Sequence, residues 1–130
     1  EKVAIAAQLD ATGIALVAKN KRGKSTDQIT KATTLQVSFN ITRNVTATSG
    51  VKDIYVRIMS PTGSLLNGEG SFSYENRTLQ YSMKRSVEYN GEETPVSLFW
   101  NVSQALQGGT YQVSIFADGN MIGSRSFTFK

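Results

Sequence analysis

Four stretches of this chain alternate apolar and polar side chains, and this period of two constrains the fold more than any other feature. Apolar residues occupy every second position in segments 35–41, 54–58, 96–100 and 111–117. Successive side chains of a β-strand point to opposite faces, so the pattern predicts strands with one buried and one solvent-facing side. The residues expected to hold the core together are Phe39, Ile54, Val56, Ile58, Leu98, Trp100, Tyr111, Val113 and Ile115.

Short turn signals separate these segments. Glu75-Asn76, Asn90-Gly91 and Asp118-Gly119 tolerate positive φ and favour tight reversals. No helical segment lies between the strands, which favours antiparallel pairing. We therefore expect an all-β fold, an antiparallel immunoglobulin-like β-sandwich of about 7–9 strands, with residues 1–130 as a single domain. Residues 1–20 are expected to add two short edge strands, because Thr12-Gly13 interrupts any long helix and Ile14, Leu16 and Ala18 resume the alternation.

The composition argues against catalysis. The chain has no Cys and no His, so it lacks thiolate nucleophiles, the usual general base and the commonest neutral metal ligand. The adjacent carboxylates Glu92-Glu93 lie beside Asn90-Gly91, where a solvated turn is the simpler explanation. Four aspartates lack the spacing of a compact calcium loop, although separate loops at one end of a sandwich can gather such ligands. We expect a protein that is not an enzyme and that holds no cofactor. These aspartates are Asp10, Asp27, Asp53 and Asp118.

The net charge is +4, from 14 Lys and Arg against 10 Asp and Glu. The one dense basic run spans residues 19–24, and the Asn and Gly within it favour a solvated turn over a surface for nucleic acid or anionic lipid. No apolar run approaches the length that spans a bilayer. No nucleic-acid partner is therefore expected.

One candidate partner surface emerges from the residues that alternate with the core. If the strands at 54–58, 96–100 and 111–117 are neighbours in one sheet, their outward side chains share an unusually apolar face. Aromatic residues, Met and Arg are enriched where proteins meet proteins. The alternative is that an edge segment, such as residues 1–20, covers this face. The candidate partner surface consists of Tyr55, Arg57, Met59, Phe99 and Phe116.

A carbohydrate- or ligand-binding module is the alternative function, with carbohydrate as the alternative partner. Trp100, or the three tyrosines Tyr74, Tyr81 and Tyr89, would then have to stack on a sugar. Trp100 shares its phase with the apolar residues of its own segment, so we expect it in the core.

A family resemblance is carried by five segments: SGVKDIYVRIMSPTG, FSYEN, YSMKRSVEYN, VSLFW and GGTYQVSIFADGNMIGSRSFTFK. They resemble the C-terminal immunoglobulin-like β-sandwich domain of uncharacterised bacterial membrane-anchored coiled-coil proteins, over nearly the whole chain. The resemblance implies a structural or protein-protein interaction module of the bacterial cell envelope, facing the periplasm. It implies that the chain is the C-terminal fragment of a longer protein, reaching the membrane only through an upstream anchor. A protein partner or self-association is then expected, and no catalytic or ligand residues carry over.

Overall fold

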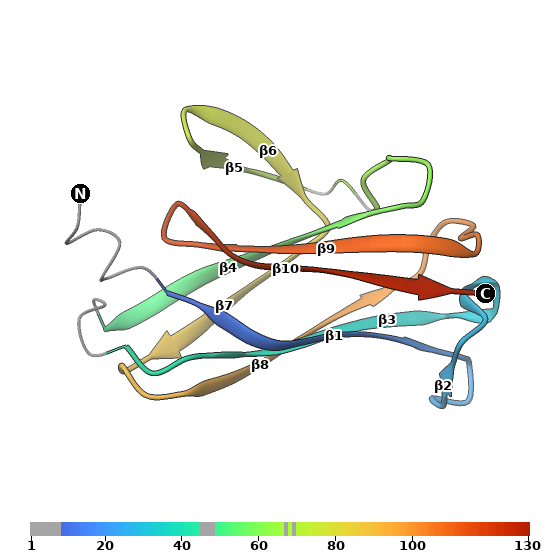
Figure 1. Ribbon diagram of the computed structural model, residues 1–130, viewed down its shortest axis with the longest axis horizontal. Coiled ribbons are helices and arrows are strands. Elements are labelled where there is room, and N and C mark those ends of the chain that lie inside the picture. The colour runs from blue at the N-terminus through green and yellow to red at the C-terminus, as the bar shows by residue number, and fades with distance from the viewer. Residues whose placement is uncertain (1–8, 45–48, 67, 69) are drawn as a thin grey trace.

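The computed structural model describes residues 9–44, 49–66, 68 and 70–130, and these form ten strands and one 3₁₀ turn (Figure 1). None of the helical structure in this part of the chain has the length and apolar character needed to cross a bilayer. The elements are β1 (Ala11–Lys19), β2 (Ser25–Thr26), η1 (Ile29–Lys31), β3 (Thr34–Ile41), β4 (Gly50–Met59), β5 (Gly70–Tyr74), β6 (Arg77–Tyr81), β7 (Met83–Tyr89), β8 (Thr94–Asn101), β9 (Gly109–Ala117) and β10 (Asn120–Phe129).

Two four-stranded sheets pack face to face. The strand orders are β2-β1-β3-β8 and β10-β9-β4-β7, and every pair is antiparallel. Hairpin β5–β6 belongs to neither sheet and lies outside the two layers in Figure 1. The predicted all-β antiparallel sandwich is confirmed. Its two sheets hold eight strands, and the separate hairpin brings the described number to ten.

The core lies between the sheets and follows the alternation in the sequence. Leu98 and Trp100 on β8 are 4% and 7% exposed, whereas Val56 on β4 and Val113 on β9 are fully buried. All nine residues that were expected to hold the core together are buried, which confirms that prediction. Each large apolar side chain removed from water contributes about 1.5–3 kcal/mol, so this set supplies the main driving force for pairing the sheets.

The N-terminal part of the chain differs from the prediction of two short edge strands. Residues 1–8 lie outside the described residues, and from Ala11 onward one continuous strand, β1, pairs with β3 inside the sheet. Gly13 does not end this strand, because its φ of 64° allows one extra residue to be inserted at a bulge between Thr12 and Ala15. The prediction of two short strands is therefore wrong for the described part of this segment, although β2 pairs only with Ala18 and Lys19 and leaves the rest of β1 at the sheet edge.

Two tight turns form as the sequence indicates. Glu75 and Asn76 have φ values of 48° and 63° between β5 and β6, and Asp118 and Gly119 have 52° and 78° between β9 and β10. Positive φ at both central residues is the geometry of a type I′ hairpin turn, which matches the twist of the flanking strands. These turns fix the registers of both hairpins.

Candidate interaction surface

The structure divides the predicted partner surface between two sheets. Tyr55, Arg57 and Met59 lie along the outer side of β4, and Tyr55 pairs with Phe116 on β9. Phe99 lies on β8, which is in the opposite sheet and pairs with β3. The expectation that all five residues share one face is therefore wrong for Phe99. Alternation predicts which way a side chain faces within its strand but does not specify the neighbouring strand.

Hairpin β5–β6 covers part of the outer face of β4 and β9. The ring of Phe72 stacks on Tyr55 with centroids 4.5 Å apart and an interplanar angle of 9°, and lies 5.1 Å from the ring of Phe116. Tyr74 meets Phe116 edge to face at 5.0 Å. Phe116 is consequently only 3% exposed. A segment of the chain covers this face, as the alternative interpretation required, but the segment is residues 70–81.

The other predicted residues of β4 also make internal contacts. The Nε of Arg57 donates a hydrogen bond of 2.8 Å to the carbonyl oxygen of Gln80 in β6. Met59 forms an isolated bridge with Leu65 in the loop after β4. The Nζ of Lys84 lies 5.5 Å from the ring centroid of Tyr55. The Arg57 and Met59 contacts attach the hairpin and its connecting loop to the sheet, whereas the Lys84 contact joins β7 to β4 within the sheet.

Phe99 differs from the rest because its side chain is 59% exposed. It lines a groove of about 310 Å³ between the beginning of β7 and the end of β8. The apolar part of the groove lining comes from Met83, Leu98 and Trp100, which are 5%, 4% and 7% exposed. The groove exists because β7 and β8 belong to different sheets and each is an edge strand.

The backbone of β8 on the groove side has no strand partner among the described residues. Arg85 Nη1 donates to the carbonyl oxygen of Ser97, so the backbone groups of Ser97 face away from β3. Alternate residues of a strand direct their backbone groups to the same side, which gives Phe99 the same orientation. Pro95 lies two positions before Ser97, so its backbone faces the same side of β8. Because proline lacks an N–H, it limits pairing at the start of the strand.

The side chains considered for sugar stacking are occupied within the fold. Trp100 lies in the core, as expected, and Tyr89 is 1% exposed. Tyr81 lies 5.3 Å from Tyr55, and Tyr74 contacts Phe116. Sequence reasoning missed that Phe99 is the ring left open to solvent. The alternation in the sequence shows that Phe99 points away from the core, but it does not show whether another strand covers this side chain.

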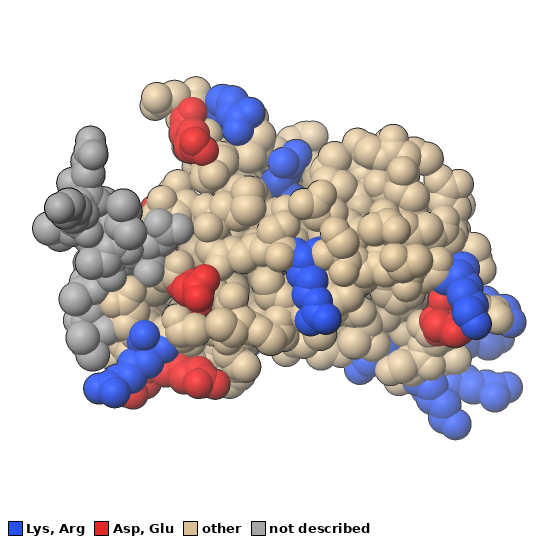
Figure 2. Space-filling model, in the orientation of Figure 1, with Lys and Arg blue, Asp and Glu red and all other residues tan. Residues whose placement is uncertain are grey.

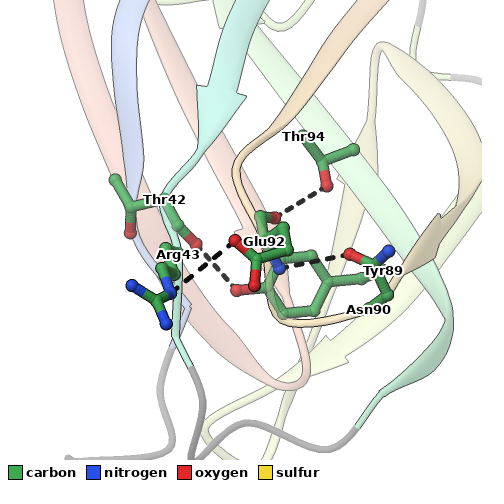
Figure 3. A network of polar contacts seen from close by, with 6 residues as sticks. All are labelled: Thr42, Arg43, Tyr89, Asn90, Glu92 and Thr94. Carbon is green, nitrogen blue, oxygen red and sulfur yellow. Dashed lines mark hydrogen bonds and ion pairs between the residues drawn. The ribbon is translucent and has the colours of Figure 1, made fainter.

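Tyr89 also ties the turn between β7 and β8 to the loop after β3 (Figure 3). Its hydroxyl donates a 2.7 Å hydrogen bond to the carbonyl oxygen of Thr42. Next to it, Arg43 and Glu92 form an ion pair of 3.6 Å, and the N–H of Glu92 donates to the side chain of Asn90. Both charged side chains of the pair are about two-thirds exposed. The carboxylate of Glu92 therefore lies in a solvated turn, where its partner is a surface arginine.

The described aspartates are spread over the molecule. Asp118 pairs with the largely buried Nζ of Lys52 at 2.8 Å, and Asp53 accepts a hydrogen bond of 2.6 Å from Ser86. Asp27 pairs with Lys130 at 3.3 Å. Among the residues that the structure describes, no group of three or more acidic, His or Cys side chains could hold a metal ion.

Two tyrosines have raised pKa values with structural causes. A side-chain hydrogen bond with Glu75 raises the pKa of Tyr74. Burial raises the pKa of Tyr111, whose hydroxyl donates to the carbonyl oxygen of Gln107 and accepts from its N–H. Tyr111 thereby supports the backbone that leads into β9.

Comparison with known proteins places this architecture in a family. The model of a family described as "Domain of unknown function (DUF8428)" matches residues 11–130, the part that runs from β1 to the last residue. The chain belongs to this family. The match begins at the first strand and includes both sheets, hairpin β5–β6 and the β7–β8 groove. No curated protein matches the chain at a significant level.

Solved structures give a likeness of fold only. A β-glucosidase from Kluyveromyces marxianus is 13% identical with a TM-score of 0.50, over 91% of this chain and 15% of its own. An alkylpurine DNA glycosylase from Pseudomonas fluorescens, bound to DNA containing an abasic site analog, is 14% identical with a TM-score of 0.49, over 94% of this chain and 30% of its own. The chain thus spans under a third of either protein, and identity at this level carries no function across.

Proposed function

We propose that this domain is a non-catalytic protein-interaction module of the bacterial cell envelope, and that an extended segment of its partner protein binds along the free edge of β8. The observation that carries the proposal is the groove beside that edge. An added strand gains affinity from main-chain hydrogen bonds and specificity from pockets for alternate side chains. The β7–β8 groove offers both on a small scale, because backbone around Phe99 that has no strand partner among the described residues lies beside an apolar lining, while Arg85 occupies the carbonyl oxygen of Ser97.

The side chains around the groove suit a protein partner. Phe99 provides an exposed aromatic surface, and aromatic residues are enriched at the centres of protein interfaces. Lys84 and Arg85 line the same groove. We therefore propose a partner segment that alternates apolar residues, which face the lining, with acidic residues that meet these two cations.

The non-catalytic and envelope parts of the proposal rest on other support. The acidic side chains Asp53, Glu92 and Asp118 each have a structural partner and lie on separate segments. The cell envelope and the periplasmic side come from the sequence resemblance to membrane-anchored coiled-coil proteins. The module would then present the β8 edge at the end of a stalk.

The test begins with a random peptide library displayed on phage and selected against the folded domain. Bound peptides should alternate apolar and acidic residues. In ¹⁵N NMR spectra of the complex, the amide protons of Ser97 and Phe99 should shift and become protected from hydrogen exchange. Selected peptides that perturb only other surfaces would contradict the proposal.

A matched pair of variants distinguishes specific binding in the groove from nonspecific binding to any exposed apolar side chain. Phe99→Ser should weaken peptide binding by at least about tenfold, since an aromatic hot spot contributes about 2 kcal/mol or more and about 1.4 kcal/mol corresponds to tenfold. Val51→Ser removes a similarly exposed apolar side chain from β4, in the other sheet, and should leave binding unchanged. Light scattering of both variants tests self-association. A dimer lost only in Phe99→Ser would identify a second copy as the bound partner.

The outer face around Phe99 supports carbohydrate as a second candidate partner. Gln36 pairs with Phe99, and Ser38 pairs with Ser97, so amide and hydroxyl groups surround the exposed ring. Neutral hydrogen-bonding groups beside an aromatic ring can recognise a sugar. A glycan array probed with the domain and with Phe99→Ser discriminates the two functions. Selective glycan binding that is lost in the variant would favour carbohydrate.

A further inference from the structure

Basic side chains gather at one end of the sandwich. Residues 19–33 and Lys130 contribute six of the 14 Lys and Arg of the chain but only one of its 10 Asp and Glu. The rest of the chain holds eight basic and nine acidic residues, so the net charge of +4 originates at this end. Figure 2 shows several blue side chains at the end where Figure 1 places β2 and the C-terminus.

The fold brings three segments together to form this basic end. The turn after β1 is fixed by Asn20, whose side-chain oxygen accepts hydrogen bonds from the N–H groups of Arg22 and Lys24. Residues around η1 are joined to the end of β10, because Ile29 N–H donates to the carbonyl oxygen of Lys130. Ile29 is itself fully buried. The basic side chains therefore project from an ordered scaffold.

A hollow of about 420 Å³ lies between the turn and η1. Lys21 and Arg22 line it from the turn, and Lys31 lines it from η1, together with Asn20 and Thr33. Within the described residues, the one ion pair at this end joins Lys130 to Asp27, so it neutralises none of the three cations of the hollow.

We infer that this basic end docks on an anionic phospholipid bilayer, with a headgroup phosphate in the hollow. Clustered Lys and Arg side chains are attracted to anionic lipid surfaces, and the attraction increases with each cation. Nucleic acid fits less well, because no aromatic ring lines the hollow for base stacking and η1 has only three residues, too few to enter a groove. The inference goes beyond the solvated turn that the sequence favours, and it is independent of the β8 edge.

The test is co-sedimentation of the domain with vesicles of phosphatidylcholine alone or mixed with phosphatidylglycerol. We expect binding to the anionic vesicles only. Raising NaCl from about 0.1 M to about 1 M shortens the Debye length from about 10 Å to about 3 Å and should abolish it. Lys21→Gln with Lys31→Gln removes a cation from each side of the hollow and should weaken binding about 30-fold.

The matched control is Arg43→Gln with Arg77→Gln, which removes the same charge from exposed positions outside the basic end. It should weaken binding less than about threefold, because those side chains do not face the membrane. Equal losses in the two double variants would overturn the inference, as would equal binding to both kinds of vesicle. A short DNA duplex supplies phosphate without a bilayer, and tighter binding to it than to anionic vesicles would also overturn the inference. Circular dichroism verifies that both variants fold.

Discussion

Replacing Phe72 by Ala tests how hairpin β5–β6 is held on the sandwich. Its ring is 9% exposed and contacts Tyr55 at 4.5 Å and Phe116 at 5.1 Å. Each aromatic pair contributes about 0.5–1.5 kcal/mol beyond simple burial, so the two contacts together contribute about 2 kcal/mol. The hairpin pairs with neither sheet, and an isolated two-stranded hairpin is at best marginally stable in water. We therefore expect Phe72→Ala to detach it while the sheets stay folded.

The matched control is Phe39→Ala, which truncates a ring of the same kind that lies between the sheets and is 3% exposed. A Phe→Ala change in a core lowers the free energy of unfolding by about 3–5 kcal/mol, and all of this loss appears in global unfolding. Phe72→Ala removes about 2 kcal/mol of ring contacts in addition to the burial of the ring, and its total cost in urea unfolding should stay below that of Phe39→Ala, because detachment limits the loss to the free energy with which the hairpin docks on the sheet.

Amide hydrogen exchange followed by NMR distinguishes the two outcomes. In Phe72→Ala, the amides of β5 and β6 should lose nearly all protection, while those of Val56 and Val113 in the core remain strongly protected. The argument is refuted if Phe72→Ala costs as much as Phe39→Ala and all strands lose protection together. Hairpin and sandwich would then be one cooperative unit.

Three further predictions concern single side chains. Tyr89→Phe removes the hydroxyl that bonds to the loop after β3 and should cost about 1–2 kcal/mol, measured as a lower urea midpoint. Asp118→Asn keeps a residue that tolerates positive φ but leaves the Lys52 ammonium without its carboxylate, so we expect a loss of about 2–4 kcal/mol. Lys52→Met, which removes the buried charge itself, should cost less than about 1.5 kcal/mol, and the reverse order in urea unfolding would contradict this account. Burial raises the pKa of Tyr111 above its ordinary value of 10.0, so folding favours the neutral phenol. The stability it contributes is present below pH 10.0 and is lost as the pH rises through the folded-state pKa, and urea unfolding in Tyr111→Phe should show a weaker decline over that range.

The sequence predicts the core well because the side of a strand to which each side chain points is a local property. Val56 and Trp100 each lie in a run that alternates every second residue, and burying such a run requires only that some second sheet cover it. The turn at Asp118-Gly119 is equally local, since its two residues alone determine the backbone geometry. These features could be read without knowing any long-range contact.

Which residues share the candidate surface depends on the order of the strands in each sheet. The alternation of apolar and polar residues does not specify that order. Tyr55 and Phe99 have similar outward phases, yet β4 pairs with β7 and β9, whereas β8 pairs with β3. Which edges pair is determined by the packing of the complete core and by how the connections cross it. The cover provided by Phe72 was hidden for the same reason, because the docking site of a hairpin is a tertiary property.

The basic end shows that the same charged residues can indicate one structure in the sequence and form a larger surface in the folded molecule. Residues 19–24 alone indicate a solvated turn. Only the fold adds Lys31, from the nearby η1, and Lys130, which is distant in sequence, to the same end of the molecule. A local run of cations thus becomes a surface built from three segments, and its electrostatic attraction sums over all of them.

The β8 edge is protected in a way that limits what can bind there. An unguarded edge strand invites pairing with other chains, and proline and charged side chains are common protective devices. Pro95 removes one donor, and Arg85 occupies the carbonyl oxygen of Ser97. An incoming strand therefore finds free backbone groups mainly around Phe99, too few for a long ladder. Most of its affinity must come from side chains in the groove, which favours a selective partner over indiscriminate edge-to-edge pairing.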